Sequence, residues 1–143
     1  MKKTISTLSL LLLLFVGTQV QAQKLTVDGF TARTNDLSAR TTPRLDNNNV
    51  PCALVKVQLA ASGAIFEGNV VGNVAYKTSE YWVYMPEGSK RLTIKHEGYL
   101  PLNVEFANYG ISSLESKTTY QLVITGVVAK AQGEDENYTP TGW

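Results

Sequence analysis

The stretch "EYWVYMPEGSKRLTIKHEGYLPL", from Glu80 to Leu102, decides the fold class of this chain. Two runs rich in aromatic and branched residues flank Pro86-Glu87-Gly88, and the pair Gly98-Tyr99 leads into a third run. Runs of this kind, bounded by proline and glycine, are typical of short β-strands separated by tight turns. The stretch therefore predicts three consecutive strands.

The proline-glycine turn also predicts how the first two of these strands pair. Pro86 presets the first angle of a type I turn and Gly88 accepts the positive φ that follows, which favours a three-residue hairpin loop. Trp82 then lies opposite Leu92 on the apolar face. A four-residue loop would instead place Trp82 and Tyr84 on the outer face, since a slip of one residue turns every side chain over. The sequence leaves both registers open.

Short alternating runs recur along the rest of the chain, and 53–59 is the clearest of them. No stretch after the N-terminal apolar run keeps a helical period over three turns, although 35–40 could form one helical turn capped by Asn35 or Asp36. This pattern predicts an all-β fold, an antiparallel β-sandwich of about seven strands. The expected strands lie at 24–30, 53–59, 65–66, 74–77, 80–85, 90–96, 100–106 and 118–128.

The first 22 residues have the pattern of a secretory signal peptide. A basic start at Lys2-Lys3 precedes a short apolar run, and small or medium residues at Val20-Gln21-Ala22 suit cleavage after Ala22. We therefore expect a signal peptide at 1–22, a folded domain at 23–128 and a polar tail at 129–143. The expected localisation is exported, either to the periplasm or to the cell surface.

The charge of the processed chain argues against two classes of partner. Removing Lys2 and Lys3 lowers the count of basic residues from 13 to 11, against 12 acidic residues, so the net charge becomes −1. A near-neutral chain has no basic footprint for nucleic acid and none for anionic lipid. No second apolar segment approaches the roughly 20 residues of a membrane-spanning helix, so we expect no transmembrane segment after cleavage.

Candidate residues for chemistry are few. The single cysteine, Cys52, lies among apolar neighbours and is expected to be a small buried hydrophobic residue. The single histidine, His96, stands beside Glu97 and is expected at the surface, because a metal site needs several ligands at defined spacing. The sequence therefore predicts no catalytic residue, no metal site and no cofactor. Weak candidates for binding a ligand are Tyr81, Trp82 and Tyr84.

A further pattern of turns and strands lies within 67–106. It consists of Gly68, Gly72, Pro86, Gly88, Leu92-Thr93-Ile94, Glu97-Gly98-Tyr99 and Pro101-Leu102. With these residues, 67–106 resembles the PEGA domain, a small β-sandwich of bacterial envelope and surface proteins. More broadly, 30–124 is similar to an N-terminal module of exported Gram-negative proteins. The chain departs from the family because Pro-Glu-Gly-Ser, at Pro86 to Ser89, replaces Pro-Glu-Gly-Ala and lies at a later turn.

These observations favour one function and leave a second open. The first is a non-catalytic envelope or surface module that acts through contacts with other proteins or as a structural spacer. The alternative is a glycan-binding module, in which exposed aromatic rings stack on sugars. The expected partners are envelope or surface proteins, with glycan as the alternative.

Overall fold

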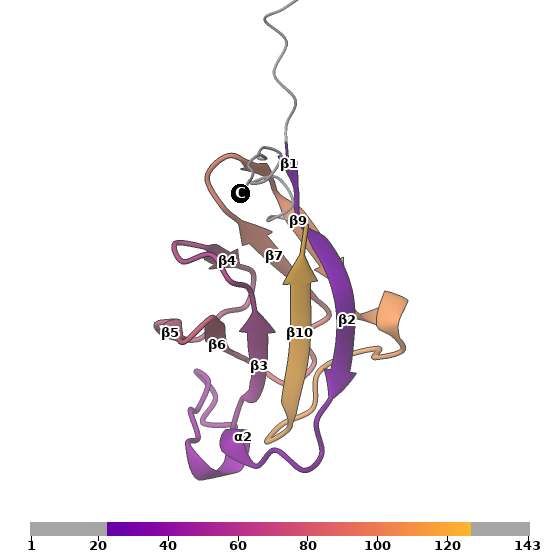
Figure 1. The fold of residues 1–143 in the computed structure, drawn as a ribbon. Coiled ribbons are helices and arrows are strands. Elements are labelled where there is room, and N and C mark those ends of the chain that lie inside the picture. The colour runs from indigo at the N-terminus through magenta and orange to yellow at the C-terminus, as the bar shows by residue number, and fades with distance from the viewer. Residues whose placement is uncertain (1–22, 127–143) are drawn as a thin grey trace, which may run out of the picture.

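The computed structural model describes residues 23–126, and this part of the chain is mostly β-structure (Figure 1). The predicted all-β class is confirmed. The described residues form ten strands rather than about seven, because four of the ten have only two or three residues. The strands are β1 (Gln23–Lys24), β2 (Thr26–Ala32), β3 (Ala53–Gln58), β4 (Ile65–Glu67), β5 (Ala75–Lys77), β6 (Glu80–Met85), β7 (Arg91–Lys95), β8 (Tyr99–Leu100), β9 (Leu102–Glu105) and β10 (Thr119–Thr125).

The larger sheet has five strands in the order β2-β10-β3-β6-β5. Its two central strands, β10 and β3, run parallel, and Figure 1 shows their arrows pointing the same way while β2 points back. The expected purely antiparallel arrangement is therefore wrong at this pair. Strand alternation predicts which residues share a face but not which strand becomes a neighbour, because parallel partners lie far apart in sequence.

Two smaller sheets complete the β-structure. Strands β4, β7 and β9 form an antiparallel sheet in the order β4-β7-β9. Strands β1 and β8 form a short parallel pair, in which Gln23 lies opposite Tyr99. The first described residues are thereby attached to the segment between β7 and β9.

One apolar cluster joins the five-stranded and three-stranded sheets. Val55 and Val83 of the larger sheet belong to the same buried cluster as Leu92, Ile94 and Val104 of the smaller one. Near β2 and β10, the ring of Phe30 contacts three further aromatic rings, two of them stacked and one edge-on. Burial of this shared face is the main source of stability, since each fully buried Val or Leu side chain contributes about 1.5–3 kcal/mol.

The turn at Pro86 connects the two sheets instead of forming a hairpin. Strand β6 pairs with β3 and β5, whereas β7 pairs with β4 and β9, so the predicted pairing of Trp82 with Leu92 is wrong. The bend itself is as expected, with Gly88 at φ 84°. Its backbone N–H donates to Leu114 O at 2.8 Å, so residues near Leu114 supply the hydrogen bonds that a partner strand would have made.

Two short helical segments lie outside the sheets. The expected helical turn is present as α2 (Ser38–Thr41), later than the predicted 35–40, and its N-cap is Leu37 rather than Asn35 or Asp36. The irregular segment after β9 begins with a 3₁₀ turn, Phe106–Tyr109. In the described part of the chain, no helix has the length and apolar character to cross a membrane. The predicted signal peptide at 1–22 and the predicted tail at 129–143 lie outside the described residues.

Candidate functional site

The three aromatic candidates lie on one strand but face two different environments. Side chains alternate along β6, so Tyr81 and Val83 point into the shared core while Trp82 and Tyr84 point to the outer face. Tyr81 and Tyr84 are buried, with 3% and 4% of their surface exposed, and Trp82 is half-buried. Among the three, Trp82 alone keeps a substantial exposed surface.

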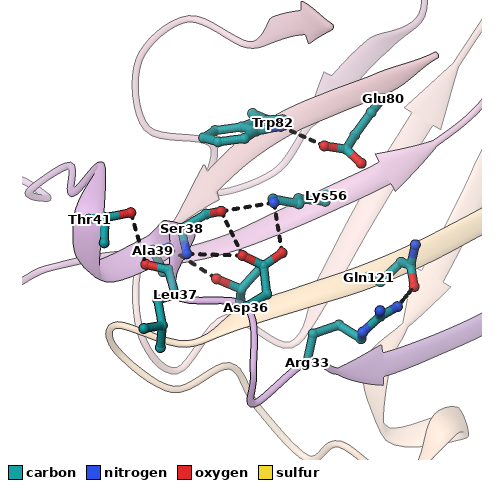
Figure 2. Close-up of polar contacts among 11 residues, drawn as sticks. Arg33, Asp36, Leu37, Ser38, Ala39, Thr41, Lys56, Glu80, Trp82 and Gln121 are labelled. Atoms are coloured by element: carbon teal, nitrogen blue, oxygen red, sulfur yellow. Dashed lines mark hydrogen bonds and ion pairs between the residues drawn. The ribbon is translucent and has the colours of Figure 1, made fainter. Parts of the chain in front are cut away.

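Trp82 is surrounded by charged groups from its own strand and from both neighbouring strands. The register places Lys56 of β3 opposite Trp82 on one side and Ala75 of β5 on the other. The ammonium groups of Lys56 and Lys77 lie 4.7 and 3.8 Å from the ring centroid. The indole Nε1–H donates to Glu80 Oε2 at 2.8 Å (Figure 2). Both lysines therefore interact with the face of the ring that an aromatic platform would offer a ligand.

Lys56 also anchors the segment that precedes α2. Its Nζ donates to Asp36 Oδ2 at 2.7 Å and to the Ser38 hydroxyl at 2.9 Å, and the Ser38 N–H donates to Asp36 Oδ1 (Figure 2). Burial alone would raise the pKa of Asp36, but the hydrogen bonds from Lys56 and Ser38 outweigh it and lower this pKa from 3.8 to about 2. Asp36 thus joins the loop after β2 to the outer face of β3.

The rest of the outer face is covered by a small buried cluster. Ala39 of α2 packs with Cys52, Leu54 and Tyr84, and the Tyr84 hydroxyl donates to Thr42 O. Cys52 is 1% exposed, as expected from its neighbours, and burial raises the pKa of its thiol. A buried thiol with a raised pKa is a poor nucleophile, so Cys52 acts here as a packing residue.

The side chain of His96 connects the end of β7 to the loop that contains Ser62. Its Nε2 lies 2.8 Å from Ser62 O and its Nδ1 lies 3.1 Å from Glu97 O, so both ring nitrogens contact backbone carbonyls. The ring also meets Tyr99 edge-on. Within 23–126, no group of three or more His, Cys, Asp or Glu side chains is arranged to hold a metal ion.

A second surface feature lies beside β4 and the segment that leads to β5. An open depression of about 630 Å³ is lined by residues of 64–68, 70 and 72–74, and its bulky apolar side chains are Ile65, Phe66, Val70 and Val74. The ring of Phe66 contacts the ring of Tyr81, and the exposed ring of Tyr76 in β5 also contacts Tyr81. Apolar side chains from both sheets therefore reach the surface here.

A scan of the chain against protein-family models found no match, and searches of curated proteins and of solved structures found no similar protein. The resemblance to the PEGA domain therefore stays a prediction. Sequence reasoning missed the contact between Asp36 and Lys56, because two residues on a loop and a distant strand carry no shared local signal. It also missed the depression beside β4, because the position of the loop that lines it depends on the tertiary fold.

Proposed function

We propose that this protein is a non-catalytic, exported module of the bacterial envelope or cell surface, and that it acts by binding another protein. The observation that carries the proposal is the pair of exposed large apolar side chains, Ile65 and Tyr76, at and beside the depression next to β4. Tyr76 is 42% exposed although it points to the side of the sheet that forms the core. Exposed large apolar side chains that gather on one part of the surface are typical of protein–protein contacts.

The fold we infer for the module is a β-sandwich related to PEGA domains. The shared apolar cluster between the five-stranded and three-stranded sheets supports the two-layer arrangement. The turn glycines Gly88 and Gly98, which carry part of the resemblance, both have positive φ, at 84° and 86°. Residues other than glycine rarely adopt a positive φ, so glycine has a physical reason to be present at these two positions of the resemblance.

A pair of matched variants tests the proposed protein contact. Tyr76→Lys places a charge beside the depression, and Leu45→Lys places the same charge at a side chain that is 51% exposed outside the depression. We expect chemical cross-linking in envelope preparations, read by mass spectrometry, to give a defined partner with wild type and Leu45→Lys and to lose it with Tyr76→Lys. Equal yields in all three, or no defined partner in any, would contradict the proposal.

The alternative function is glycan binding, and the half-buried indole of Trp82 is the observation that favours it. The neighbouring Lys56, Lys77 and Glu80 offer hydrogen-bonding groups beside a ring, as sugar sites do. A titration of envelope glycans that is followed by tryptophan fluorescence tests this function, with Trp82→Phe as the blank for the signal of Trp143. A response that is the same in wild type and Trp82→Phe would remove Trp82 as the platform.

A further inference from the structure

A small basic depression lies at the end of the molecule where β2 ends and β10 begins. Its volume is about 140 Å³, and it includes side chains from the loop after β2, from α2 and from the turn before β10. The stretch 33–40 and the turn at 117–119 are far apart in sequence, and the fold brings them together at one end (Figure 1). The lining residues are Arg33, Thr34, Asp36, Leu37, Arg40, Lys117, Thr118 and Thr119.

The depression has a net positive charge, because its acidic lining residue does not neutralise its three basic side chains. Asp36 is its only acidic lining residue, and both carboxylate oxygens of Asp36 already accept hydrogen bonds from Lys56 or Ser38. The guanidinium of Arg33 uses one nitrogen to donate to Gln121 Oε1 (Figure 2). Among the described residues, Arg40 and Lys117 form no ion pair. Two unpaired cations and one further guanidinium therefore share a small, open space.

Lys117 is held in place by a strained but well-anchored turn. Its φ is 61°, a left-handed conformation that costs a lysine about 1 kcal/mol or more and that glycine or asparagine adopts more readily. The Lys117 N–H donates to Cys52 O, the Ser116 hydroxyl to Pro51 O and the Leu54 N–H to Thr118 O. Strain of this kind at a ligand-facing residue is common in functional sites, where the rest of the structure sets the geometry.

We propose that this depression binds a single phosphate group, carried by a larger molecule. Guanidinium groups form paired hydrogen bonds to phosphate oxygens, and a lysine adds a point charge. The volume suits one such group and is smaller than the roughly 300 Å³ at which ordinary ligand pockets begin. This inference is independent of the proposed protein contact, which lies on another side of the molecule.

The decisive variant is Lys117→Asn, because it separates binding from folding. Asparagine tolerates the left-handed angle, so the thermal midpoint is expected to stay the same or rise, while the affinity for phosphate falls about tenfold. Lys24→Asn is the control with the same net charge, since Lys24 is an exposed residue of β1 at the opposite end of the molecule (Figure 1). It is expected to leave the affinity unchanged.

The full-length protein is titrated with inorganic phosphate, with glycerol 3-phosphate and with phosphatidylglycerol vesicles, all at constant ionic strength. Isothermal calorimetry reads the two soluble ligands and co-sedimentation reads the vesicles. Saturable binding of a soluble phosphate that Lys117→Asn weakens and Lys24→Asn does not supports the site, and vesicle binding with the same dependence identifies a lipid headgroup as the source. Absence of soluble binding, or equal weakening in both variants, overturns the proposal.

Discussion

The two faces of the five-stranded sheet use the same strands in opposite ways. On the inner face, Val55, Val57 and Leu122 are completely buried in the core shared with the smaller sheet. On the outer face, Lys56 and Gln121 occupy the intervening positions and remain partly exposed. The comparison shows that the inward residues hold the fold together, whereas outward residues such as Lys56 and Gln121 form polar contacts with neighbouring loops and strands.

The outer face is itself divided. Near α2 it is covered by the buried cluster of Ala39, Cys52, Leu54 and Tyr84, while around Trp82 it stays accessible. The covered half resembles a small second core with few members. Its contribution to stability is therefore expected to be smaller than that of the inner face, and variants can measure the difference.

The largest expected effect comes from truncating one leucine on each face. Leu122 and Leu54 are both fully buried, on opposite faces of the sheet. Leu122→Ala is expected to reduce the free energy of unfolding by about 4 kcal/mol and Leu54→Ala by about 2 kcal/mol, because the loops over the outer cluster can collapse into the space. Urea denaturation of both variants measures this. A cost for Leu54→Ala as large as that for Leu122→Ala would mean that the outer cluster is a full second core.

A smaller, pH-dependent effect is expected at Asp36. Its pKa in the folded protein, about 2, lies below the ordinary 3.8, so ionised Asp36 stabilises the fold above pH 4 and loses this contribution as the pH falls towards 2. The contribution is about 1–2 kcal/mol after allowance for solvent screening of a side chain that is 29% exposed. Asp36→Asn should abolish this part of the pH dependence of unfolding. Parallel curves for wild type and variant between pH 4 and 2 would show that the contact with Lys56 contributes nothing.

The smallest expected effect on stability is at Lys77, an exposed residue on the accessible half of the outer face. Lys77→Ala should change the free energy of unfolding by less than about 0.5 kcal/mol, as for most surface substitutions. It should nevertheless shift the fluorescence of Trp82, whose ring centroid lies 3.8 Å from the Lys77 ammonium. Lys95→Ala, which removes a cation paired with Glu67, serves as the control and should leave the spectrum unchanged. Identical spectra for both variants would contradict the contact with Lys77.

Local features of the fold were predictable from the sequence. The bounds of β6 coincide with the expected 80–85, and Gly88 has the positive φ, 84°, that the turn at Pro86 predicts. The burial of Cys52 also follows from its apolar neighbours. Each of these properties depends on residues within a few positions of one another, so one sequence carries enough information to determine them.

Properties that depend on distant residues were not predictable. The turn at Pro86 specifies a bend, but the partners of the two strands that it joins are chosen by burial of whole faces, so the hairpin did not form. Both registers that the sequence left open for Trp82 assumed that hairpin, so neither could determine which face the side chain occupies. The basic depression also requires two stretches that are far apart in sequence, 33–40 and 117–119, to meet at one end of the sheet.

The position of β10 between β2 and β3 has a consequence for the order in which the five-stranded sheet can fold. Strand β2 is the first long strand of the described chain, yet its neighbour in the sheet is the last strand. A chain that emerges from a narrow channel in N-to-C order must carry β2 unpaired until Thr119–Thr125 arrives. Such long-range closure is slow, so the five-stranded sheet is expected to form only after Thr119–Thr125 is available.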